Sequence, residues 1–298
     1  MKKQHQILLR VAGWFLLLWW LWPANLFLRW ESLLIALAAV ELVPWCLVLL
    51  RQTVPGWFPL LSIPFALTLT LDGPWWLVLP YLGAAIGYTW RSFVAHLSQP
   101  QRPLSGWVQI FALGYWATAA LWALMHMVHF QPFGFDPVIV TLTAAHFHLA
   151  GLVLSTLVFA NLMLHNRPIT RWLGMLSLAG MPLVALGITL TRLGYAPIIE
   201  QGAALFFIGY ALLFIWHQTS MAFQANLPAR VRTGWLLGAG SLVAGMLLAT
   251  LYALRFQIPL EWINIPNLKY WHGTLNTLGF GFCSLLGWVN IISQDNKS

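Results

Sequence analysis

Residues 137–164 read PVIVTLTAAHFHLAGLVLSTLVFANLML, without one Asp, Glu, Lys or Arg. Roughly twenty apolar residues in helical conformation cross the hydrocarbon core of a bilayer, so this stretch predicts a transmembrane helix. Backbone polar groups must be satisfied within the segment when it lies in lipid. A chain built from many such stretches is therefore expected to form an all-α bundle.

Apolar stretches of this kind recur along the whole chain. Of its 298 residues, 60% are hydrophobic and 7% charged, against roughly 25% charged in a soluble domain. No segment is long or polar enough for a separate soluble domain, so we expect a single transmembrane domain over residues 1–298. About ten spanning helices are predicted, at 7–28, 31–50, 56–71, 74–90, 105–130, 137–164, 170–190, 198–223, 232–254 and 270–292.

The basic residues indicate how this polytopic bundle is oriented. Alternate connections, taken with the chain ends, hold 11 and 4 of the 15 Lys and Arg residues. Cytoplasmic loops are enriched in Lys and Arg, so the richer set predicts that both termini are cytoplasmic. The poorer set is Arg29, Arg192, Arg255 and Lys269. The basic residues lie singly or in pairs despite the net charge of +8, so the expected partner is the lipid bilayer and not nucleic acid. The sequence carries no signal for an oligomeric state.

Histidines gather in the half of the bundle that this topology places outside. His126 and His129 lie three residues apart and share a helix face. His146 and His148 lie two residues apart, about 200° around the helix, so their rings are expected to point to opposite sides. On the last helix His272 and Asn276 share a face. The expected outer set is His126, His129, His146, His148, Glu200, His272 and Asn276.

Two windows carry a resemblance to known proteins. Residues 145–151, AHFHLAG, and residues 271–280, which contain Trp271-His272-Gly273 and Asn276, resemble the YndJ-like family of bacterial membrane proteins. The resemblance implies a multi-pass protein of the bacterial plasma membrane, with motif positions His146, His148, His272 and Asn276. The family has no settled activity, although it is sometimes labelled a transporter.

The first window is also similar to about eight residues of haem-copper oxidase subunit I, in which two histidines hold two haems. The chain contains no His-Pro-Glu and no His-His pair, so that family's copper ligands have no counterpart here. An oxygen reductase is therefore not expected, whereas a simpler haem site stays open.

Three functions fit these polar residues. We favour a protein that binds haem or a transition metal, since several histidines and few carboxylates suit Cu, Zn or haem iron. In that reading His146, His148, His272 and Asn276 hold a cofactor, and His126, His129 and Glu200 hold a metal. The alternative is a small-solute or proton-coupled transporter, in which Glu41 on the second helix relays protons. A membrane enzyme is the least favoured, because the HxxH and HxH spacings differ from the His boxes of di-iron desaturases.

Overall fold

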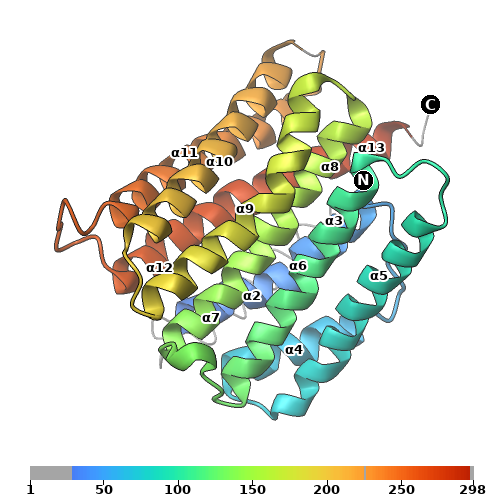
Figure 1. Ribbon diagram of the computed structural model, residues 1–298. Coiled ribbons are helices and arrows are strands. Elements are labelled where there is room, and N and C mark those ends of the chain that lie inside the picture. The colour runs from blue at the N-terminus through green and yellow to red at the C-terminus, as the bar shows by residue number, and fades with distance from the viewer. Residues whose placement is uncertain (1–28, 225, 296–298) are drawn as a thin grey trace.

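A computed structural model describes residues 29–224 and 226–295 of the chain. These residues form an all-helical bundle with short connections, in which neighbouring helices lie side by side along their lengths (Figure 1). Nine helices follow one another in this described part of the chain. The helix expected at 7–28 lies outside the described residues.

Three of the helices are composite, because a π-helical segment interrupts each of them. Their parts are α2 (Trp30–Leu37), η2 (Ala38–Leu42) and α3 (Val43–Leu49); α7 (Pro137–His146), η5 (Phe147–Val153) and α8 (Leu154–Leu164); and α12 (Ile265–Thr274), η6 (Leu275–Phe282) and α13 (Cys283–Asp295). The three π-helical segments pack against one another near the middle of the bundle. Such segments occur mostly as single-turn bulges and are frequent at functional sites.

The remaining six helices are regular. They are α4 (Pro59–Leu71), α5 (Leu79–Leu97), α6 (Leu104–Met127), α9 (Pro168–Arg192), α10 (Ile198–Gln224) and α11 (Ala229–Ala253). Short 3-10 turns, η3 (Trp75–Val78) and η4 (Pro132–Gly134), precede α5 and α7. The expected helix at 74–90 therefore begins at Leu79 and runs on to Leu97. The expected helix at 270–292 begins five residues earlier, at Ile265, where Asn264 caps it by accepting from the Asn267 amide.

Six of the described helices are long and apolar enough to cross a membrane. They are Trp30–Leu49, Leu104–Met127, Pro137–Leu164, Pro168–Arg192, Ile198–Gln224 and Ala229–Ala253. The expected total of about ten spans stays a prediction. α4 has only 13 residues, and α5 and the last helix are not among the helices that are long and apolar enough to cross a membrane. Large apolar side chains are nevertheless exposed on the bundle surface: Leu60, Trp90 and Phe223 are between 64% and 73% exposed. Surfaces of this kind face lipid.

The helix at 137–164 is the centre of the bundle. Buried residues make up 83% of its most apolar window, against 33% for α9, α10 and α11. It packs on α6, where Leu113 and Trp116 are fully buried. The segment whose composition indicates the fold is thus the most buried of the described spans.

Contacts between connections divide the bundle into two ends. Arg29 pairs with Asp72, Arg192 donates to the Gly134 carbonyl, and Glu200 pairs with Arg255. We call this the cavity end, for the cavity described below. At the opposite end the Arg91 guanidinium donates to Gln52 Oε1 over 2.6 Å. The connections that the Lys and Arg count assigns to one side of the membrane therefore lie at one end of the bundle.

Candidate functional site

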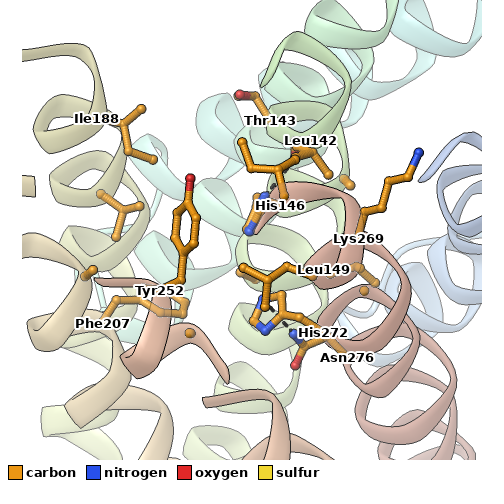
Figure 2. Close-up of a pocket in the computed structure, with 18 of the residues that line it drawn as sticks. Leu142, Thr143, His146, Leu149, Ile188, Phe207, Tyr252, Lys269, His272 and Asn276 are labelled. Atoms are coloured by element: carbon orange, nitrogen blue, oxygen red, sulfur yellow. Dashed lines mark hydrogen bonds between the residues drawn. The ribbon is translucent and has the colours of Figure 1, made fainter. Parts of the chain in front are cut away.

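A cavity of about 420 Å³ opens at the cavity end, among α2, α7, α9, α10, α11 and α12. Figure 2 shows Ile188, Phe207 and Tyr252 on one wall and Lys269, His272 and Asn276 on the other, with His146 and Leu149 between them. The volume falls in the range of about 300–1,000 Å³ typical of small-molecule sites. Most lining side chains are apolar, so the few polar ones would orient a ligand.

His146 presents a basic nitrogen to this cavity. Its Nδ1 lies 2.7 Å from the Leu142 carbonyl oxygen, and because a carbonyl only accepts, Nδ1 carries the hydrogen. The neutral ring therefore keeps its lone pair on Nε2. The side chain is exposed even though it belongs to the central helix, because the cavity reaches it. His146 ends α7, and η5 begins at the next residue.

The His272 ring faces His146, with the two ring centroids 6.1 Å apart. Its Nδ1 donates to the Gly245 carbonyl oxygen over 2.9 Å, so Nε2 accepts, and the Asn276 amide donates to it over 3.0 Å. Both nitrogens of His272 are thus engaged by the protein. Figure 2 shows Asn276 directly beside the ring. The predicted shared face of His272 and Asn276 is confirmed.

Gly245 allows α11 to approach this pair closely. A Cβ at Gly245 would lie 2.8 Å from Asn276 Oδ1, so a larger residue would displace the amide. Asn276 Oδ1 itself is buried and has no hydrogen-bond partner among the residues that the structure describes. Buried polar atoms are usually satisfied, and this oxygen, which packs against Gly245, is an exception.

Ion pairs surround the mouth of the cavity. Glu200 accepts from Arg255 over 2.8 Å, and Glu31 lies 3.1 Å from Lys269 Nζ. The Arg255 guanidinium also stands over the Tyr252 ring, 4.2 Å from its centroid. The first pair joins α10 to the turn after α11, and the second joins α12 to α2. Both are largely shielded from solvent, which strengthens them relative to surface pairs. Glu200 is therefore held by a cation of the protein.

His148 lies on the other side of the central helix and does not reach the cavity. It is fully buried; its Nδ1 donates to the Ala144 carbonyl oxygen over 2.9 Å, and its Nε2 lies 3.2 Å from the Tyr81 hydroxyl. Tyr81 in turn stacks on Phe65, with centroids 4.0 Å apart. The opposite directions expected for His146 and His148 are confirmed, but His148 thereby separates from the other two imidazoles.

His126 and His129 are also apart from the cavity. His126 Nδ1 hydrogen-bonds Thr141 Oγ1 at 2.8 Å, which ties the end of α6 to α7. His129 follows the end of α6 with a left-handed backbone (φ 56°) and is exposed. The structure thus brings together His146, His272 and Asn276, with Glu200 at the mouth, and places His126, His129 and His148 elsewhere.

The predicted side chains do not fit a multi-ligand metal centre. No group of three or more His, Cys, Asp or Glu side chains is placed to hold a metal ion anywhere in residues 29–224 and 226–295. The physical reason is visible at three of the candidates: both His272 nitrogens, His148 Nε2 and Glu200 are occupied by partners within the protein. His146 Nε2 is the remaining imidazole nitrogen at the cavity.

Comparison with known proteins agrees with the two sequence windows. The profile of the YndJ-like protein family matches residues 9–280. The chain belongs to the YndJ-like family. A curated relative, the "Uncharacterized membrane protein YndJ" of Bacillus subtilis (strain 168), is 26% identical over 184 residues, which are 60% of this YndJ-like chain and 32% of the relative. The chain thus spans about a third of the relative's length. No solved structure matches the chain.

Family membership establishes a multi-pass membrane protein, and lipid is its surrounding. Neither match is to a haem-copper oxidase, so the short likeness around His146 gains no support. Three contacts of the polar residues escaped the sequence reasoning: the Gly245 carbonyl with His272, the Glu31–Lys269 pair at the cavity, and Tyr81 with His148 outside it. Each contact joins residues on different helices, and a single sequence contains no signal for such pairings.

Proposed function

We propose that the cavity is the binding site of a small-molecule transporter and that it opens to the outside of the cell. The observation that carries the proposal is the placement of a polar floor, His146, His272 and Asn276, at the inner end of an apolar chamber. Binding sites of transporters lie inside the bundle and combine apolar walls with a few convergent polar groups. The outward direction follows from the four basic residues expected on that side.

The polar atoms favour a ligand that donates hydrogen bonds. Neutral His146 offers the Nε2 lone pair to the cavity. This nitrogen is an acceptor, so a hydroxyl or amine group on the ligand would donate a hydrogen bond to it. The apolar walls, formed by side chains such as Leu149, Phe207 and Met246, would take a hydrocarbon body. The expected ligand is a small, mainly apolar alcohol or amine.

The three π-helical segments supply a means of movement. η5 begins directly after His146, and η6 contains Asn276, so the floor of the cavity is attached to both. The hydrogen bonds of a π-helical segment span one residue more than those of an α-helix. Its conversion or migration would rotate the floor residues relative to the rest of the helix, as in helix register shifts on the microsecond to millisecond scale. Glu41 is buried in the third segment, η2, where a protonation step would couple to this movement.

Ligand retention tests the proposal. The full-length protein would be purified in lipid nanodiscs and its non-covalent adducts identified by native mass spectrometry. Ala204→Trp on α10 fills the cavity, whereas Leu205→Trp, one residue along, adds the same ring at a 43% exposed position outside it. We expect a discrete adduct on the wild-type and Leu205→Trp proteins that Ala204→Trp loses. Identical adducts on all three proteins would exclude the cavity as the binding site.

Transport is tested once the adduct has been identified. Uptake of that compound into proteoliposomes is expected with the wild-type protein and reduced with Glu41→Gln, which removes the titratable group. Uptake that is independent of Glu41 would set aside proton coupling through η2 and leave the binding site in place.

A single haem held by His146 is a second candidate, favoured by the His146 Nε2 lone pair, which is left available at the cavity. A Soret band in the purified protein that His146→Leu abolishes is the expected result for haem. A spectrum without that band would remove this candidate.

A further inference from the structure

A second cavity, of about 380 Å³, lies at the opposite end of the bundle. It is formed by the connection between α8 and α9, the first turn of α9 and the last turns of α10. Its lining includes two histidines and one arginine and no carboxylate: His165, Arg167, Ile169, Trp216, His217, Ser220, Met221 and Gln224. It shares no residue with the first cavity, so an inference from it stands apart from the proposed function.

His217 is the buried polar group of this cavity. The side chain is 7% exposed, and its Nε2 has no hydrogen-bond partner among the residues that the structure describes. An imidazole nitrogen left in this state is unfavourable relative to one that is hydrogen-bonded. Buried polar atoms without partners are rare in proteins, so His217 points to a group that the cavity receives.

Positive charge converges on the same space. Arg167 is exposed and makes no ion pair with the described residues, while His165 lies two residues before it. Arg167 is also the N-cap of α9, a helix of 25 residues, and Ile169 of its first turn lines the cavity. The N-terminus of a long helix carries a partial positive charge and amide hydrogens without partners inside the helix, which together attract anions.

We propose that this cavity binds a phosphate group, with Arg167 as its principal charged contact and His165 and His217 as hydrogen-bond donors. A guanidinium binds phosphate through paired hydrogen bonds, and an imidazole donates to the same oxygens when it is protonated. Trp216, 62% exposed on the bundle surface beside His217, is the kind of residue that sits at the level of lipid head groups. The phosphate would come either from a phospholipid head group or from free phosphate in solution.

Thermal unfolding of the full-length protein in a non-ionic detergent tests the site. One series adds inorganic phosphate and the other adds short-chain phosphatidylglycerol. We expect the unfolding temperature to rise in at least one series, and Arg167→Gln to weaken the apparent affinity about tenfold or more, as the loss of a charge-assisted hydrogen bond implies. A response to phosphate assigns the free anion, and a response to lipid alone assigns the head group.

Two further variants separate binding from folding. Arg171→Gln removes a neighbouring guanidinium that donates to Asn166 and does not line the cavity, and it should keep the wild-type response. Without ligand, His217→Leu should unfold at or above the wild-type temperature, because it removes an unsatisfied buried nitrogen. With phosphate or lipid added, its unfolding temperature should rise less than that of the wild-type protein. The proposal is overturned if neither series raises the wild-type unfolding temperature, or if Arg167→Gln and Arg171→Gln respond alike.

Discussion

Removing the Tyr81 hydroxyl tests whether His148 is a packing residue of the bundle. Tyr81→Phe deletes one oxygen, 3.2 Å from His148 Nε2, and leaves the stack on Phe65 and the edge contact with Trp116 in place. His148 is fully buried, so its Nε2 would lose its partner with no water to replace it. Loss of a buried partner costs about 1–3 kcal/mol, while hydrogen bonds between transmembrane helices average about 0.6 and reach about 1.7 kcal/mol.

The 3.2 Å separation is long for a hydroxyl donor, which places the expected loss near 1 kcal/mol. The assay is the free energy of unfolding from an SDS titration, measured for Tyr81→Phe, His148→Leu and the double variant. Because either single change leaves the other group unsatisfied, the double variant should cost less than the sum of the two, with a coupling of about 0.6–1.7 kcal/mol.

Tyr88→Phe is the matched control on the same helix. Its hydroxyl donates to the Thr53 carbonyl at an exposed position, where water can replace it, so we expect a smaller loss. Additive costs for Tyr81 and His148 would refute the hydrogen bond between them. Loss of the cavity adduct in His148→Leu, with stability unchanged, would refute the separation of His148 from the site.

Two other predictions concern stability, each checked by thermal unfolding in detergent. Gly234→Ala should destabilise the protein by about 1–3 kcal/mol, because the added Cβ would lie 2.8 Å from the Cys283 carbonyl oxygen. In the control Gly240→Ala the added Cβ meets nothing within 4 Å, so stability should be unchanged or slightly raised. Equal effects of the two changes would contradict the close packing of α11 on the last helix. Glu200→Gln should lower the free energy of unfolding by about 1–3 kcal/mol, a value between those for exposed and buried ion pairs. The Glu200 side chain is 12% exposed and that of Arg255 is 23% exposed. The double variant Glu200→Arg with Arg255→Glu, which reverses the ion pair, should restore part of that stability. A double variant that restores none of it would show that the ion pair does not stabilise the cavity mouth.

The positions of the helices were largely predictable from the sequence, because hydrophobic length is a local property. The stretch at 137–164 forms a helix with those bounds, and the expected helix at 198–223 ends one residue later. Angular spacing also predicted that His146 and His148 point apart and that His272 and Asn276 meet. These inferences need only the rotation of about 100° per residue.

The partners of these residues were not predictable, since they depend on which helices become neighbours. Three imidazoles at a similar depth looked like one cluster, but His148 turns toward Tyr81 on α5, which the sequence did not single out. The π-helical segments were also missed. η2 and η5 read AAVEL and FHLAGLV, and neither sequence carries a local signal that distinguishes a π-helical segment from an α-helix.

Thiol labelling from outside the cell tests the central claim most directly, namely that His146 lines an outward-facing cavity. In a variant with Cys46 and Cys283 replaced by alanine, His146→Cys and His148→Cys would be treated in intact bacterial cells with a membrane-impermeant maleimide. We predict labelling at position 146 without permeabilisation and none at the fully buried position 148. Labelling at 146 only after the membrane is opened, or equal labelling at both positions, would contradict this account of the cavity.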